Sequence, residues 1–299
     1  MRSNQLSYPA VRHFLKCGCK GMANFFYDQI IASIFFTFNA NIRYHIMTSL
    51  LELAIRAAQL AGADIMQIYT DPAADFGIER KADNSPLTRA DKAAHERIVS
   101  LLADTGIPIL SEEGAHTPYE ERRHWRRLWI VDPLDGTKEF IKRNGEFTVN
   151  IALVEDGKPV MGVIYVPAKD ELYYGAVATN DGQAAVLHTP HEGAAPEPRP
   201  FTVVASRSHL SADTEAYINE LRQRHPDLDL VSSGSSLKIC LVAEGLADVY
   251  PRHAPTMEWD TAAGHAIALA AGCRMVDAIS GEELRYNKED LHNPWFIVS

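Results

Sequence analysis

Trp129-Ile-Val-Asp132-Pro-Leu-Asp135-Gly136-Thr137 begins as a short apolar strand and ends in two aspartates three residues apart. Proline fixes one backbone φ and glycine permits a positive one, so a tight turn is expected here that directs both carboxylates the same way. The alternative is an ordinary surface turn, since Asp, Pro and Gly are common turn residues. The apolar strand in front of the turn favours a functional site.

The segments around this stretch predict a mixed α/β fold. Two amphipathic helices are expected, one of about 20 residues from Ser49 and one from Thr88 to Gly106. Short β-branched runs follow, at residues 107–110, 149–154 and 160–166, and Glu155-Asp-Gly-Lys158 predicts a hairpin turn between the last two. After residue 200 the pattern alternates between strand and helix, with expected elements at 201–205, 212–224, 228–231, 236–244, 247–250 and 261–271.

Composition and charge exclude several classes of protein. The 299 residues are 46% hydrophobic and 23% charged, which is typical of a globular protein. A net charge of -10 repels nucleic acid and anionic lipid, so a nucleic-acid partner is not expected. A polyanionic substrate would need metal ions or a local basic patch.

The first 46 residues differ from the rest of the chain. They carry five basic residues and one acid, and their longest apolar run, Ile30–Phe38, is too short to span a membrane. We expect a non-homologous extension, from an upstream start codon before Met47; a signal peptide and a membrane-surface segment are the alternatives. The proline-rich stretch 188–200 predicts a loop between a metal-binding subdomain at 47–190 and a substrate-binding subdomain at 200–299. The four cysteines lack metal or redox spacing, which favours a reducing cytoplasm.

Two further acidic groups stand at the ends of apolar elements. Glu112 and Glu113 follow the apolar run at 107–110, and Asp260 opens an apolar helix. Each has a simpler interpretation, as a solvated turn or as a helix N-cap. Converging carboxylates repel one another unless cations lie between them, and all-oxygen ligands select hard ions, Mg²⁺ first.

These three acidic segments resemble, in the same order, the metal motifs of the inositol monophosphatase superfamily of lithium-sensitive phosphatases. The resemblance extends over residues 47–299, and four runs are similar to the bacterial 3'(2'),5'-bisphosphate nucleotidase branch: 81–88, 132–151, 206–209 and 234–238. It implies a layered αβαβα sandwich and a cytoplasmic enzyme. Residues 1–46 have no counterpart in the pattern.

The resemblance also implies roles for individual residues. Two or three Mg²⁺ ions would be held by Glu112, Asp132, the carbonyl of Leu134, Asp135 and Asp260. Asp91, Glu112 and Thr137 would activate the attacking water, although Thr88-x-x-Asp91 is also typical of a helix capping box. Substrate contacts would come from Asp135, Gly136, Thr137, Lys138, Ser206, Arg207, His209, Ser235, Ser236, Lys238, Arg252 and Asp260.

The implied activity is a Mg²⁺-dependent removal of the 3'-phosphate from adenosine 3',5'-bisphosphate, inhibited by Li⁺ and serving sulfur assimilation. Phosphoadenylyl sulfate is an expected second substrate. No stable membrane insertion is expected, and peripheral contact with the cytoplasmic face of the inner membrane stays open. An inositol monophosphatase, a sugar bisphosphatase and a non-catalytic binding regulator are the alternatives; Lys138-Glu-Phe favours the nucleotidase.

Overall fold

A computed structural model describes residues 47–73, 75–81, 85–114, 117–177, 186–191, 199–206 and 211–299. The chain divides into two units, Met1–Thr48 and Ser49–Ser299, and of the first unit only Met47 and Thr48 are described. The extension expected at residues 1–46 lies outside the described residues. The second unit contains all the helices, strands and site residues described below.

A six-stranded sheet forms the centre of this unit, in the order β3-β4-β5-β6-β7-β8. β3 and β4 are parallel and every other neighbouring pair is antiparallel. The hairpin expected between the two longest apolar runs is present between β5 and β6. The strands are β3 (Ile109–Ser111), β4 (Arg127–Asp135), β5 (Thr148–Glu155), β6 (Lys158–Val166), β7 (Glu171–Ala176) and β8 (Val186–His188).

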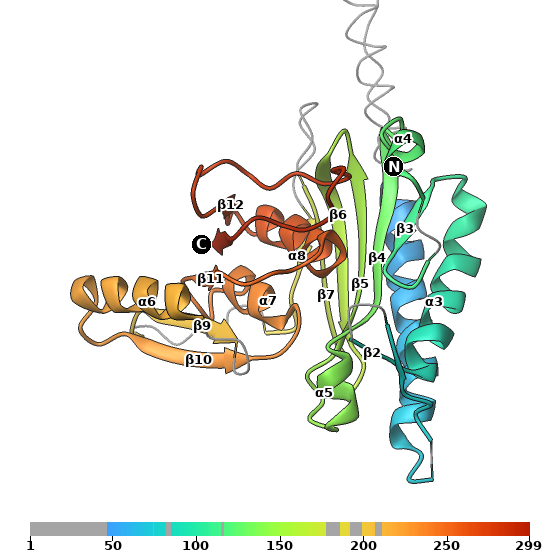
Figure 1. Ribbon diagram of the computed structural model, residues 1–299, viewed down its shortest axis with the longest axis horizontal. Helices are drawn as coiled ribbons and strands as arrows, with labels where there is room; N and C mark the ends of the chain where they lie inside the picture. Colours follow the sequence, from blue (N-terminus) through green and yellow to red (C-terminus); the bar gives the residue numbers. More distant parts are fainter. Residues whose placement is uncertain are drawn as a thin grey trace, which may run out of the picture. The chain divides into compact units, whose positions relative to one another are not determined.

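Two helices cover one face of this sheet (Figure 1). The first, unlabelled in the figure, spans residues 47–70, of which 49–70 lie in the second unit. The second is α3 (Arg89–Leu102), which continues into η1 (Ala103–Thr105). Alanines dominate the buried face of the first helix, which permits close packing. The buried indole of Trp129 on β4 donates to Thr105 Oγ1 at 3.2 Å and fixes the sheet against the end of α3.

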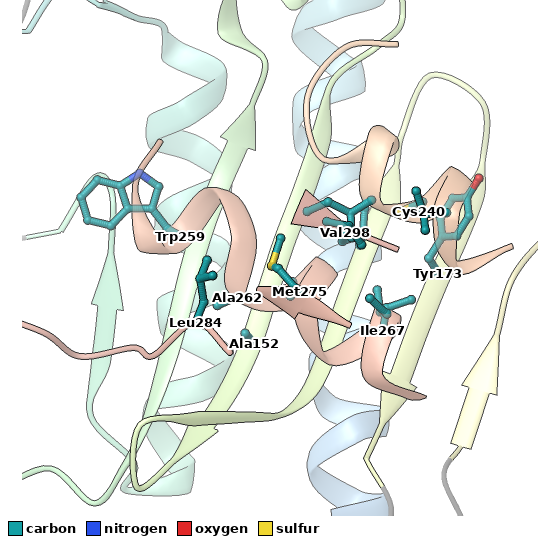
Figure 2. Packing of buried hydrophobic residues seen from close by; sticks show 14 of the residues in the cluster. Ala152, Tyr173, Cys240, Trp259, Ala262, Ile267, Met275, Leu284 and Val298 are labelled. Carbon is teal, nitrogen blue, oxygen red and sulfur yellow. The ribbon is translucent and has the colours of Figure 1, made fainter. Parts of the chain in front are cut away.

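The opposite face of the sheet packs against α8 (Glu258–Ala270) and α7 (Leu237–Ala243). Figure 2 shows Ala152 from the sheet and Ala262 and Ile267 from α8 within one apolar cluster, together with Met275 and Val298. Successive strand residues point to opposite faces, so the same strands supply both cores. α8 is therefore buried between two layers of strands.

The second layer of strands joins a parallel pair to a three-stranded antiparallel sheet. β9 pairs with β10, and β13 lies between β11 and β12. Val204 of β9 faces the α7 side, whereas Val203 and Ala205 pack against α6 on the outside. The elements are β9 (Thr202–Ser206), α6 (Ala212–Arg224), β10 (Asp229–Ser233), β11 (Tyr250–Arg252), β12 (Met275–Asp277) and β13 (Phe296–Val298). The order helix, sheet, helix, sheet, helix confirms the αβαβα prediction.

The structure differs from the sequence prediction at the two aspartates of β4. β4 does not end in a turn at Asp132 but continues to Asp135, with a bulge in its pairing with β5 between them. Such a bulge redirects side chains while the strand stays paired. Gly136, at φ 91°, then turns the chain into the unpredicted helix α5 (Thr137–Ile141).

Several short elements were not predicted. They are β1 (Glu79–Arg80), β2 (Pro86–Leu87), α4 (Tyr119–Arg122), β7, β8, β12 and β13. Most are three residues or fewer, too short to show a hydrophobic period, and tertiary packing fixes them.

Candidate active site

Three aspartates from two elements meet at the carboxyl end of β4. Asp132 and Asp135 come from β4 and Asp260 from the first turn of α8, and each offers an oxygen within 4.8 Å of the others. Asp132 is fully buried, so burial first and repulsion from Glu112, Asp135 and Asp260 next raise its pKa well above the usual range. A neighbouring cation would relieve this repulsion.

Asp260 is not the N-cap of α8. That position belongs to Met257, whose backbone N–H donates to Asp260 Oδ2 at 2.8 Å. The N-cap interpretation of Asp260 is therefore wrong, and its second oxygen remains available to the cluster. Burial, followed by the charge of Asp135, raises the pKa of Asp260 to about 8.

Glu112 lies beside this cluster, just after β3. Its charge helps to raise the pKa of Asp132, and Lys81 Nζ donates to its Oε1 at 2.7 Å. The same ammonium contacts Glu113 Oε1 at 2.5 Å. No local sequence pattern predicts Lys81 as the cation that pairs with this acidic turn, because some thirty residues separate the two.

Asp91 caps α3 and also faces Thr137. Its Oδ2 accepts from the backbone and hydroxyl of Thr88, which forms the capping box, and its Oδ1 accepts from Thr137 Oγ1 at 3.1 Å. The two interpretations of Asp91 are thus compatible, because each uses a different oxygen. Burial raises the pKa of Asp91. The carbonyl of Leu134 is the other acceptor near the Thr137 hydroxyl, at 3.3 Å.

A cavity of about 350 Å³ opens beside the aspartates. It is lined by both acidic and basic side chains, among them Asp135 and Asp260 with Lys238 and Arg252. The Lys238 ammonium is buried and faces the Tyr250 ring at 5.5 Å, and burial lowers its pKa to about 8. Arg252 Nε is buried without a hydrogen-bond partner in the described part of the chain. These cations give the cavity a local positive region that the net charge does not suggest.

Most of the predicted substrate contacts line this cavity: Asp135, Gly136, Lys138, Ser206, Ser235, Ser236, Lys238, Arg252 and Asp260. Thr137 is not among the lining residues, although it directly follows two of them. Arg207 and His209 lie outside the described residues. Ser236 is buried, and its hydroxyl is hydrogen-bonded within the protein, to Asp135 Oδ2 at 2.7 Å.

Sequence reasoning missed other residues of this site. Lys142, Glu146 and Thr256 line the cavity, and Thr148 and Asn150 lie under Asp135. Thr148 and Asn150 carry a signal that could have revealed them, because they are two polar residues at alternate positions of an otherwise apolar strand and so share one face.

The donor set fits a hard metal ion. Every candidate ligand offers oxygen, from carboxylates or a carbonyl, and burial of like charges in the cluster is costly without a cation. A cluster of buried carboxylates suits a metal ion, and basic residues that line the adjoining cavity suit a phosphate group, so the site fits a metal-dependent phosphatase.

The chain belongs to the inositol monophosphatase family, which is metal-dependent: residues 46–294 match the sequence model of that family. No helix in the described residues is long and apolar enough to cross a membrane.

Within this family, the chain is similar to several proteins named CysQ. The chain is 48% identical over 253 residues to the 3'(2'),5'-bisphosphate nucleotidase CysQ of Salmonella typhimurium, covering 84% of this chain and 99% of that one. It is 47% identical over the same length, with the same coverage, to CysQ of Escherichia coli strain K12. The solved structure of CysQ from Bacteroides thetaiotaomicron shares 57% identity, with a TM-score of 0.74 and coverage of 84% and 97%.

Proposed function

We propose that this chain is a Mg²⁺-dependent 3'(2'),5'-bisphosphate nucleotidase that converts adenosine 3',5'-bisphosphate to AMP and phosphate. Phosphoadenylyl sulfate is the proposed second substrate and Li⁺ the proposed inhibitor. One observation carries the proposal: a cluster of three aspartates borders a cavity that Lys238 and Arg252 also line. A bisphosphate needs cations at two places, and this cavity offers a candidate metal cluster and two basic side chains. The nucleotidases to which the chain is similar support the choice of substrate.

The metal would be held by Glu112, Asp132, Asp135, Asp260 and the carbonyl of Leu134. When bound, Mg²⁺ supplies positive charge that offsets the phosphate charge, favours ionisation of an attacking water and stabilises the leaving oxygen. The carboxylates themselves hold no proton in that state, because the cation offsets the repulsion that raises their pKa values.

Asp91 and Thr137 would take up the proton of the attacking water. Thr137 Oγ1 donates to Asp91 Oδ1, so the hydroxyl oxygen is free to accept a proton as its own passes to the carboxylate. Burial raises the pKa of Asp91, which makes it a better proton acceptor than an exposed aspartate. Thr88 keeps this carboxylate in place through its other oxygen.

Lys238 and Arg252 would bind the phosphate that is not hydrolysed. Lys238 Nζ donates to the carbonyl oxygens of Ser233 and Ser235. These hydrogen bonds fix the position of the ammonium group at the first turn of α7. A phosphate in the cavity would add negative charge and raise its lowered pKa, so binding keeps this lysine protonated.

We also propose that the enzyme works in the cytoplasm and in sulfur assimilation, where this nucleotide is a by-product. Cys240 and Cys273 are both free thiols, which fits a reducing compartment. The proposed separation into subdomains at 47–190 and 200–299 follows the assignment of metal ligands and substrate contacts.

Phosphate release from three substrates tests the proposal. Adenosine 3',5'-bisphosphate, inositol 1-phosphate and fructose 1,6-bisphosphate are compared in Mg²⁺, with and without Li⁺. We expect the nucleotide to be hydrolysed fastest and Li⁺ to inhibit. A faster reaction with either of the other two substrates would support the alternatives, and tight nucleotide binding without turnover would support a regulator.

A further inference from the structure

Three buried polar residues form a hydrogen-bonded chain that ends on Asp135. Thr148 and Asn150 lie on β5, opposite Asp135 and Asp132 of β4, and Ser236 directly precedes α7. Their exposed fractions are 0%, 1% and 2%, so all three are almost completely buried, and Ser236 borders the cavity. Most buried polar groups in proteins are hydrogen-bonded, and every polar side-chain atom of these three residues has a partner.

The hydrogen bonds run in one direction. Thr148 Oγ1 donates to Asn150 Oδ1 at 2.9 Å, which fixes the amide so that its NH₂ group faces the other way. Asn150 Nδ2 then donates to Ser236 Oγ at 2.8 Å, and lies 3.4 Å from Asp135 Oδ2. Because Ser236 Oγ accepts from the amide, its single hydrogen can be donated to Asp135 Oδ2 at 2.7 Å or to the carbonyl oxygen of Asp260 at 2.9 Å. The shorter distance and the charge of the carboxylate favour Asp135 as the acceptor.

The chain also joins two candidate ligand residues. The carbonyl oxygen of Asp260 lies 2.9 Å from Ser236 Oγ, so one hydroxyl contacts Asp135 of β4 and the backbone of Asp260 on α8. Asp135 Oδ2 is held by the protein, whereas its Oδ1 makes no hydrogen bond within the described residues. One oxygen of the carboxylate is thus fixed and the other is left for an ion.

We infer that Thr148, Asn150 and Ser236 are positioning residues that orient Asp135 for metal binding, and that Ser236 acts through Asp135 rather than by contacting substrate. The inference rests on the proposed metal role of Asp135. Hydrogen bonds of this kind fix the rotamer of a ligand and leave it less to reorganise when the ion binds. Thr148 is informative because, among the residues that the structure describes, its side chain is hydrogen-bonded to Asn150 alone.

Binding of Mg²⁺ alone, measured by isothermal titration calorimetry without substrate, tests the inference. We expect Ser236→Ala to weaken Mg²⁺ binding by about 10- to 100-fold, the usual effect of removing an outer hydrogen bond to a ligand. Thr148→Val removes only a hydroxyl at nearly constant volume and is expected to weaken binding by a few-fold, on the order of threefold. Thr148→Ser keeps the hydroxyl and is expected to restore the wild-type affinity.

Circular dichroism and thermal melting in EDTA show whether each variant is folded. Folded Ser236→Ala and Thr148→Val proteins that bind Mg²⁺ as tightly as wild type would overturn the positioning role, while the proposed function would stand. A wild-type protein that binds no Mg²⁺ would overturn both. If Thr148→Val loses affinity and Thr148→Ser does not restore it, the proposed role of the hydrogen bonds would also be contradicted. That role requires the Thr148 hydroxyl, which serine keeps.

Discussion

Asp132 combines complete burial with three carboxylate neighbours, a combination that is destabilising without a cation. We predict that Asp132→Asn lowers the rate of phosphate release at least about a hundredfold, since a ligand matters more than the groups that orient it. The same change should raise the melting temperature in EDTA, because a buried charge is removed while Leu134 N–H keeps its acceptor, Oδ1.

Thermal melting in EDTA and in Mg²⁺ checks the stability part of this prediction, and a phosphate-release assay checks the rate. Wild type should gain stability on addition of Mg²⁺ and Asp132→Asn should gain little. Asp227→Asn, at an exposed position, is the matched control and should behave as wild type. An Asp132→Asn protein that is less stable than wild type in EDTA would show that the buried charges are not in conflict.

His265 provides a pH-dependent contribution to stability that is separate from the carboxylates. It is fully buried on α8, with Nδ1 at 3.0 Å from the Tyr286 hydroxyl, and burial lowers its pKa to about 3. In the unfolded chain the pKa is near 6.5, so the unfolded state takes up a proton first as the pH falls. The contribution is complete above pH 6.5 and decreases as the pH falls towards 3, by about 2 kcal/mol at pH 5.

We therefore predict that His265→Gln loses less stability than wild type between pH 7.5 and pH 5. Denaturant unfolding at the two pH values measures the difference in the free energy of unfolding. The contributions of the other titrating groups cancel in the comparison, because both proteins contain them. His124→Gln, at an exposed position, should retain the wild-type pH dependence. Identical pH dependence in His265→Gln and wild type would contradict the prediction.

At the scale of elements, the N-terminus of α3 carries a structural and a chemical role that can be separated. Thr88→Ala removes the side-chain cap and should cost about 1 kcal/mol of folding stability. Thr137→Ala removes the hydroxyl that donates to Asp91 Oδ1, outside the cap, and should change stability by less than about 0.5 kcal/mol.

In activity the order should be reversed, so that Thr137→Ala loses more activity than Thr88→Ala. We expect Thr137→Ala to lower kcat by about a hundredfold, within the usual range for proton transfer, and Thr88→Ala to lower it much less. Steady-state kinetics at a temperature where both are folded gives the comparison. Equal loss of kcat in the two variants would mean that Asp91 acts only as part of the helix cap and has no separate role in proton transfer.

The contact between β6 and α8 depends on a glycine. A Cβ on Gly162 would lie 2.1 Å from the carbonyl oxygen of Ala263, so α8 would have to move. We predict that Gly162→Ala costs roughly 3 kcal/mol of stability and lowers activity, since α8 carries Asp260. Gly272→Ala, at φ 83° with open space around it, should cost only about 1 kcal/mol of backbone strain. Thermal or denaturant unfolding of the two variants gives the comparison, and a Gly162→Ala protein as stable as Gly272→Ala would contradict the close packing.

The sequence predicted the long elements well and the details of the site less well. The β5–β6 hairpin and the capped helix α3 depend on local residues, and both were predicted. The bulge between Asp132 and Asp135 depends on pairing with β5, and the Lys81–Glu112 contact joins segments that are distant in sequence. Ser236 was predicted as a substrate contact. Its hydrogen bond to Asp135 could not be predicted, because it joins residues that only the folded protein brings together.

For the whole molecule, the net charge of -10 is compatible with a highly anionic substrate. Part of the acidic excess is the carboxylate cluster, which attracts cations, and Lys238 and Arg252 supply positive charge in the same cavity. Counter-charge is therefore local, although the average potential repels anions.

Identification of the product tests the central claim most directly. Adenosine 3',5'-bisphosphate is incubated with the protein in Mg²⁺ and the product is separated by anion-exchange chromatography against AMP and adenosine 3'-phosphate standards. The expected result is AMP with an equal amount of phosphate, and at least about a hundredfold less of both from Asp132→Asn in the same time. An unchanged nucleotide, or adenosine 3'-phosphate as the product, would contradict the proposed nucleotidase activity.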